Sequence, residues 1–231
     1  MSLKRTFDEG FQSTLGNMLT TLKQKVEPFH TALIVVDVQN DFCARGGALD
    51  RDGIDLTMVE DMIPRLVDFI DKARIVGVSI IYIQSFYFSE GNPYLTDAFL
   101  EQRMRSGNKR HLEYPLCERG SWGADFCHGI SPLSGESIVN KHCYSAFIGT
   151  DLDLILRTRK KRTLLMAGVS TDICVDNTTR VGFMYGYYTV VLKDLCATWS
   201  QELQDTTLSN IDQLYGQVET STDVLKCWQG Q

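Results

Sequence analysis

Continuous apolar runs of strand length recur along the chain. The first covers Thr31 to Asp37 and ends in a carboxylate, and similar runs follow at 78–84, 137–141, 163–169 and 188–193. A short apolar run without polar alternation is typical of a strand that is buried on both faces of a sheet. The pattern therefore predicts a mostly parallel sheet of about six strands.

Stretches with helical periodicity separate these runs. Apolar residues recur at the spacing of an amphipathic helix within 58–76, 152–159, 173–185 and 201–215. Strands that alternate with helices predict a doubly wound α/β fold, in which helices cover both faces of the sheet. An eight-stranded α/β barrel is the alternative, but it needs more strand–helix units than this chain supplies.

Three segments lie outside this alternation. Residues 1–29 carry mixed charges and a helical apolar spacing through Phe11, Leu15 and Met18, so they predict an N-terminal helical arm. Residues 30–225 are expected to form one main domain, with 226–231 as a C-terminal tail. Within that domain, residues 85–135 hold three of the five prolines and predict a long, partly helical excursion that caps or lines a site.

The overall charge argues against nucleic acid as a partner. The chain has a net charge of −6 and a pI near 5.2, and its cationic residues are scattered apart from the run 157–162, which fits a solvated helix end. Its apolar stretches are far shorter than the roughly 18 residues of a membrane-spanning helix, so no membrane partner is expected. Seven cysteines without a CxxC pair or a secretory signal predict a cytoplasmic protein.

Three reactive side chains stand at or just past the predicted strand ends: Asp37, Lys141 and Cys174. Ligands bind at the carboxyl edge of open parallel sheets. Singly, the three have simpler interpretations as a turn carboxylate, a solvated lysine and a buried thiol. Together they predict a nucleophilic cysteine whose pKa is lowered by a helix start and by the Lys141 ammonium, with Asp37 as its proton acceptor.

The chain resembles the isochorismatase-like cysteine hydrolases, a family that includes nicotinamidases, N-carbamoylsarcosine amidohydrolases, biuret hydrolases and ureidoacrylate amidohydrolases. The resemblance covers about residues 30–225. Three motifs carry it: Ala32-Leu-Ile-Val-Val-Asp37-Val-Gln39-Asn-Asp41-Phe42, Lys141-His-Cys-Tyr-Ser145-Ala-Phe147 and Ala167-Gly-Val-Ser170-Thr171-Asp-Ile-Cys174-Val.

The resemblance implies a fold, a site and an activity. Asp37, Lys141 and Cys174 would form the catalytic triad, the Val169–Ser170 peptide would be cis, and the amides of Ser170 and Cys174 would form an oxyanion hole. The enzyme would cleave a carbon–nitrogen bond of a small amide or ureido substrate through a thioester, releasing ammonia or carbamate. The resemblance further implies a homo-oligomer, a dimer or a tetramer.

The branch of the family is indicated by positions around the triad. Nicotinamidases bind a metal through an Asp-x-His after the second strand, where this chain has Ser85-Phe-Tyr87, so no metal and no cofactor is expected. Cys174 argues against the vinyl-ether chemistry of true isochorismatases. The likeness is greatest to ureidoacrylate and biuret hydrolases, and the expected substrate-binding residues are Gln84, Ser85, Trp122, Tyr144 and Phe42.

Other functions stay open at this point. A nicotinamidase-like or isochorismatase-like hydrolase is the alternative within the family. An aspartyl phosphotransferase also has an aspartate at the end of its first strand, but it usually carries a second acid two residues on, where this chain has Gln39. A non-catalytic, redox-responsive binding protein on the same fold is the alternative from another class.

Overall fold

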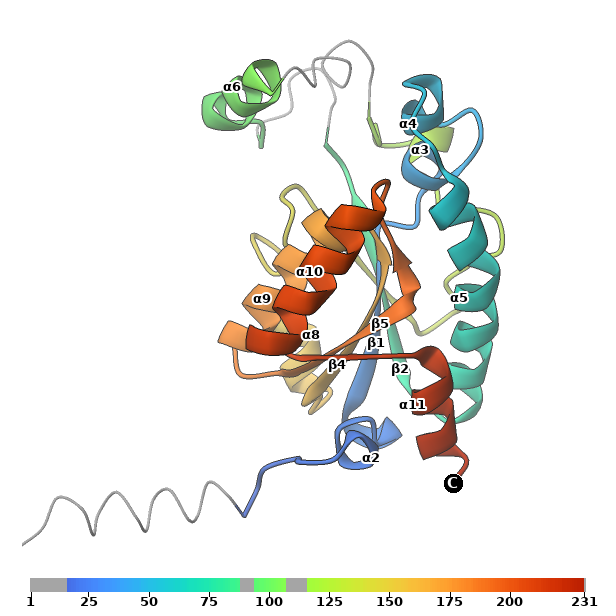
Figure 1. The fold of residues 1–231 in the computed structure, drawn as a ribbon, viewed down its shortest axis with the longest axis vertical. Coiled ribbons are helices and arrows are strands. Elements are labelled where there is room, and N and C mark those ends of the chain that lie inside the picture. The colour runs from blue at the N-terminus through green and yellow to red at the C-terminus, as the bar shows by residue number, and fades with distance from the viewer. Residues whose placement is uncertain (1–15, 88–93, 107–115, 231) are drawn as a thin grey trace, which may run out of the picture.

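The computed structural model describes residues 16–87, 94–106 and 116–230 (Figure 1). Its six strands form one parallel sheet in the order β3-β2-β1-β4-β5-β6. They are β1 (Thr31–Val36), β2 (Ser79–Ser85), β3 (Ser137–Lys141), β4 (Thr163–Val169), β5 (Tyr188–Ala197) and β6 (Gln217–Glu219). The strand order reverses between β1 and β4, which confirms the doubly wound fold and excludes the barrel.

Helices cover both faces of this sheet (Figure 1). On one face lie α5 (Thr57–Ile75), α11 (Ser221–Trp228) and α2 (Leu22–Lys25), and on the other lie α8 (Leu152–Thr158), α9 (Asp176–Met184) and α10 (Gln201–Leu214). Shorter elements gather at the carboxyl ends of the strands: α3 (Asn40–Cys43), α4 (Ala48–Arg51), α6 (Asp97–Arg105), η2 (Trp122–Ala124) and η3 (Thr171–Val175). No described helix is long and apolar enough to cross a membrane.

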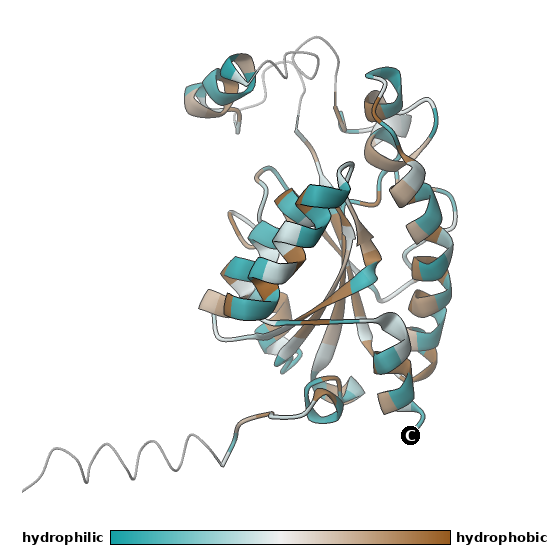
Figure 2. Cartoon of the chain, in the orientation of Figure 1, coloured by the Kyte–Doolittle hydropathy of each residue, from teal (hydrophilic) through white to brown (hydrophobic). Residues whose placement is uncertain are grey.

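The strands are hydrophobic on both faces, as Figure 2 shows, because each face has its own core. Along β1, Leu33 and Val35 belong to the core beneath α5, whereas Ile34 and Val36 belong to the core beneath α8, α9 and α10. Every residue of β1 is fully buried. This two-sided burial is the physical reason for the uninterrupted apolar runs in the sequence.

The predicted arm and tail are each described only in part. In residues 16–29 the only α-helix is α2, because Thr21 and Gln24 form a capping box that starts the helix at Leu22. Met18 therefore lies outside the helix, and Phe11 and Leu15 lie outside the described residues. At the other end, residues 226–228 are the last turn of α11 rather than a tail.

Candidate active site

Asp37 directly follows β1 at the carboxyl edge of the sheet. Its backbone has a φ of 52°, in the left-handed region, which aspartate tolerates better than most residues do. The Asp37 amide still donates to the carbonyl of Ile83 on β2, at 3.1 Å, and the side chain is 1% exposed. The chain thus leaves the sheet sharply at this point and keeps the carboxylate inside the protein.

Cys174 is placed by an irregular turn after the neighbouring strand β4. The Val169–Ser170 peptide is cis, as the family resemblance implied. The π-helical turn η3 follows and continues directly into α9. Cys174 therefore lies in the first turns of a helical segment, where backbone N–H groups lack partners within the helix.

Lys141 ends β3, two strands away from β1, and its side chain is fully buried. Its ammonium lies 2.8 Å from Asp37 Oδ2 and 3.3 Å from Cys174 Sγ. It also donates to Ser85 Oγ at 3.1 Å and to Tyr87 Oη at 3.0 Å. The three side chains at the ends of separate strands are thereby brought together around one nitrogen.

The protonation state of the triad follows from burial and from these contacts. Burial raises the pKa of Asp37 against the opposing effect of Lys141. Burial disfavours the charge of Lys141, but Asp37 and Cys174 more than offset it and hold the pKa of Lys141 well above its usual range. Burial also raises the pKa of Cys174 to about 12, although Lys141 lowers it.

The pKa of Cys174 is thus shifted upward, which is opposite to the direction that the sequence predicted. Cys174 is 7% exposed and lies next to the Asp37 carboxylate, and these two effects outweigh the ammonium. These directions favour a neutral thiol at Cys174 and a charged ammonium at Lys141. Because its pKa is raised, Asp37 is a stronger base than a solvent-exposed aspartate.

The first motif also fixes the surroundings of Asp37. Gln39 Nε2 donates to the carbonyls of Ser85 and Ala124, at 3.0 and 2.8 Å, and its Oε1 accepts from the Ser85 amide at 2.7 Å. Asp41 accepts from the amide of Cys117 at 2.7 Å. Gln39 thus connects the segment after β1 to the end of β2 and to Ala124, and Asp41 connects it to Cys117.

Three of the five expected substrate-binding residues have other places in the structure. Phe42 is 9% exposed and packs in the core beneath α5. Trp122 is 54% exposed, so its ring faces solvent rather than a buried pocket. Gln84 is turned toward the backbone, where its Nε2 donates to the Ala124 carbonyl at 2.9 Å. No hydrogen bond or ring contact among the described residues links Phe42, Trp122 or Gln84 to the triad, and their part in substrate binding stays a prediction.

Ser85 and Tyr144 do lie at the triad, and Tyr87 joins them. Ser85 supports Lys141, and the ring of Tyr144 lies 6.3 Å from that of Tyr87. Tyr87 Oη lies 3.7 Å from Cys174 Sγ. The sequence signal for Tyr87 is its position two residues after Ser85 at the end of β2, where nicotinamidases carry the histidine of their metal motif.

Ser85 and Tyr87 stand where nicotinamidases carry their Asp-x-His metal motif. Ser85 and Tyr87 present hydroxyls, which are poor metal ligands beside imidazole and carboxylate, and both are turned toward the Lys141 ammonium. Among residues 16–87, 94–106 and 116–230 no group of three or more histidines, cysteines and acids is arranged to hold a metal ion.

Comparison with known proteins places this geometry in a family. Residues 31–223 match the isochorismatase domain. Ureidoacrylate amidohydrolase RutB of Enterobacter sp. (strain 638) is 33% identical over 218 residues, which cover 89% of this chain and 94% of the relative.

Two solved structures extend the comparison. The crystal structure of a cysteine hydrolase from Pseudomonas syringae pv. phaseolicola 1448A is 26% identical with a TM-score of 0.75, and the match covers 89% of this chain and 95% of that one. Nicotinamidase PncA from Bacillus subtilis is also 26% identical, with a TM-score of 0.66 over 82% of this chain and 98% of that one. The chain therefore belongs to the isochorismatase family, as the motifs predicted.

Proposed function

We propose that this member of the isochorismatase family is an amidohydrolase that uses Cys174 to cleave a carbon–nitrogen bond of a small amide or ureido compound. The observation that carries the proposal is a buried cluster at the carboxyl edge of the sheet. In it, Asp37 Oδ2 and Cys174 Sγ both lie within 3.3 Å of the Lys141 nitrogen. A nucleophile, a base and a fixed cation in contact are the parts that acyl transfer needs.

Acylation begins when Asp37 accepts the Cys174 proton and the sulfur attacks the substrate carbonyl. The carbon–sulfur bond forms, and the carbon–nitrogen bond breaks as Asp37 passes the proton to the departing nitrogen. The raised pKa of Asp37 favours this transfer, because a stronger base removes the proton of a high-pKa thiol more readily.

Deacylation repeats these steps with water. Asp37 takes a proton from the attacking water, the carbon–sulfur bond breaks, and the proton returns to Cys174. In both half-reactions Lys141 stays protonated. Its positive charge stabilises the negative charge, which lies on Asp37 at some steps and on Cys174 at others. The amides of Ser170 and Cys174 are proposed to bind the carbonyl oxygen as it becomes negative, a contribution of about 3 kcal/mol per donor in related chemistry.

A ureido or carbamoyl substrate is favoured over nicotinamide. The relative that is 33% identical over 89% of the chain is a ureidoacrylate amidohydrolase. The nicotinamidase metal motif is replaced here by Ser85 and Tyr87, whose hydroxyls contact Lys141. The chemistry next to the triad thus differs from that of the nicotinamidase branch.

The test is a measurement of ammonia release from ureidoacrylate, biuret, N-carbamoyl amino acids and nicotinamide. Wild type is expected to turn over at least one ureido or carbamoyl compound, and Cys174→Ala to lose about 10⁴-fold or more of that rate while staying folded. Cys227→Ser, in α11, is the control and should keep full activity. Turnover by Cys174→Ala at a rate near that of wild type would overturn the proposal.

A further inference from the structure

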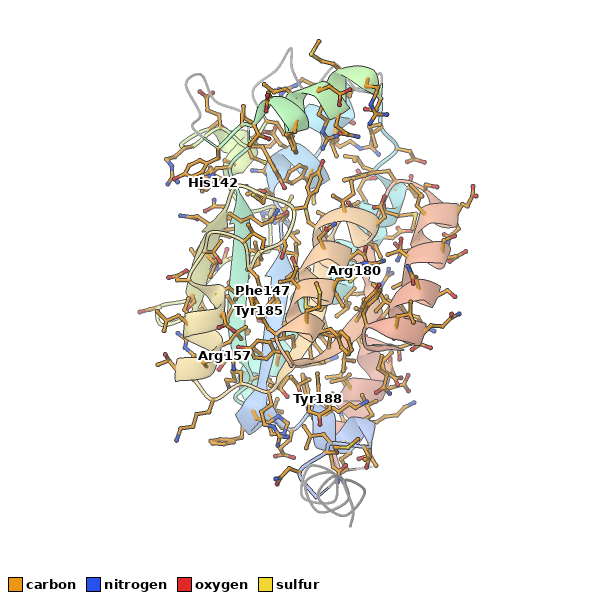
Figure 3. All side chains as sticks on the ribbon, turned by 90° about the vertical axis from the view of Figure 1, so that its left-hand side faces the viewer. His142, Phe147, Arg157, Arg180, Tyr185 and Tyr188 are labelled. Carbon is orange, nitrogen blue, oxygen red and sulfur yellow. The ribbon has the colours of Figure 1, made fainter. Side chains whose placement is uncertain are left out.

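Arg103 of α6 lies against aromatic rings on the side of the molecule that holds the triad. Its guanidinium carbon is 5.3 Å from the centre of the Phe99 ring and 5.8 Å from that of Tyr144. Its Nη2 donates to Tyr144 Oη at 2.8 Å. In Figure 3, α6 crosses the end of the molecule where His142, the neighbour of Lys141, is labelled. The guanidinium is thus held in a defined orientation at this end.

The same rings continue to the nucleophile. The Tyr87 ring lies 6.2 Å from that of Phe99 and 6.3 Å from that of Tyr144, and Tyr87 Oη is 3.7 Å from Cys174 Sγ. Burial raises the pKa of Tyr144, Arg103 opposes that rise, and charge on Cys174 adds to it. Tyr144 therefore lies within electrostatic reach of both the guanidinium and the sulfur.

The charge of Arg103 has no carboxylate partner among the described residues. Its neighbour Arg105 pairs with Glu101 at 3.1 Å, and the Lys141 charge is matched by Asp37. Within the described parts of the chain Arg103 forms no such pair, and its Nε is shielded from solvent without an acceptor there. A guanidinium has five N–H donors in one plane, of which Tyr144 uses one. The remaining donors match the geometry of a carboxylate.

We propose that Arg103 binds a carboxylate of the substrate, which makes the substrate class ureido or carbamoyl acids with an anionic end. The Phe99, Tyr144 and Tyr87 rings contact the short apolar stem between that carboxylate and the carbonyl at Cys174. This inference rests on the proposed function, because it names the substrate of the same site. It assigns specificity to Arg103 and no part in bond breaking.

The binding test uses Cys174→Ala, so that it does not depend on turnover. The probes are ureidoacrylate, 3-ureidopropionate and N-carbamoylglycine, each compared with its neutral methyl ester by titration calorimetry. Cys174→Ala is expected to bind at least one acid about 10- to 100-fold more tightly than its ester. Adding Arg103→Gln should abolish that preference and leave ester binding unchanged, whereas adding Arg105→Gln should change neither.

The inference is overturned if acid and ester bind equally, if no acid binds, or if the preference survives Arg103→Gln. In the otherwise wild-type enzyme, Arg103→Gln should raise KM for the acid with little change in kcat, whereas a general structural defect would lower kcat for acid and ester alike. Failure of the proposed function has a different result, namely no ammonia release by wild type from any probe, whatever the binding data show.

Discussion

The Lys141 ammonium has more close neighbours than it has hydrogens. An ammonium donates three hydrogen bonds and accepts none. Asp37, Ser85, Tyr87 and Cys174 all lie within 3.3 Å of its nitrogen. Because the Tyr87 oxygen accepts from Lys141, its own hydrogen is available to the sulfur 3.7 Å away. Tyr87 is therefore expected to stabilise the thiolate, at a distance at which sulfur accepts hydrogen bonds.

Replacement of Tyr87 by phenylalanine tests this role. Tyr87 lowers the pKa of Cys174, so without its hydroxyl the thiolate fraction at any pH below that pKa should fall. We expect Tyr87→Phe to slow both turnover and iodoacetamide alkylation of Cys174 by about 5- to 50-fold, with the alkylation profile shifted to higher pH.

Ser85 supplies the matched control for that experiment. Ser85→Ala removes a hydroxyl that Lys141 donates to and that is not hydrogen-bonded to the sulfur, so it should leave the alkylation profile nearer to that of wild type. If Tyr87→Phe were alkylated as fast as wild type across the pH range, the hydroxyl would have no part in stabilising the thiolate.

The sequence predicted which residues meet at the site better than it predicted their electrostatics. Asp37, Lys141 and Cys174 stand at strand ends, and a parallel sheet brings such ends to one edge. The Cys174 thiol is buried beside residues remote in sequence, such as Tyr87 and Lys141, so its raised pKa had no local signature. The burial of Phe42 likewise had no local signature, since a short helix after β1 turns its side chain into the core.

At the scale of elements, the close contact of β1 and β4 positions Asp37 beside Cys174. Gly168 has a φ of 112°, and the register between β4 and β5 shifts between Met166 and Gly168. A Cβ atom on Gly168 would lie 2.1 Å from the Val36 carbonyl oxygen. The bulge therefore requires glycine for both its backbone angle and its close approach.

Gly168→Ala is expected to destabilise the protein more than Gly77→Ala, in which the new side chain only strains the backbone angle and meets no neighbouring atom. Gly77 also has a positive φ, of 81°, but no atom lies within 4 Å of the point that its Cβ would occupy. Gly77→Ala should lower the free energy of unfolding by about 1 kcal/mol, and Gly168→Ala by about 3 kcal/mol or more, because backbone atoms must also move. Urea unfolding followed by circular dichroism measures both, and equal effects would contradict the close-approach argument.

The elements that the sequence did not reveal include two short ones near the C-terminus. β6 has three residues and α11 has eight, and neither is long enough to show a clear period. The boundaries of the longer elements were predicted to within about three residues, except that β5 continues to Ala197. Its extension passes Lys193 and Asp194, which end the apolar run although the backbone stays in the sheet.

At the scale of the whole molecule, the last helix connects the two ends of the described chain. The Trp228 ring stacks on Phe69 of α5 at 5.2 Å, and its Nε1 donates to the Val26 carbonyl at 2.8 Å. In Figure 1, α11 and α2 lie together at the end of the sheet opposite α6. This contact is remote from the triad, so it stabilises the fold without taking part in the chemistry.

The expected homo-oligomer stays a prediction at this scale. The face of α8 and α9 carries exposed apolar side chains, among them Leu154, Met184 and Tyr185. Figure 3 shows Tyr185 on this side of the molecule together with Arg157. Such a surface is compatible with burial against a second copy, and sedimentation of the full chain measures the oligomeric state directly.

Trp228→Ala tests whether the two chain ends depend on each other. The substitution removes a half-buried ring and leaves the Val26 carbonyl without its donor, so it should lower the free energy of unfolding by about 2 to 3 kcal/mol. Trp122→Ala is the matched control, because that ring is 54% exposed and its loss should cost about 0.5 kcal/mol. Since Trp228 lies far from Lys141, Trp228→Ala should keep the wild-type kcat at temperatures where it stays folded. A loss of kcat in the folded variant would show that the ends of the chain are coupled to the active site, contrary to this assignment.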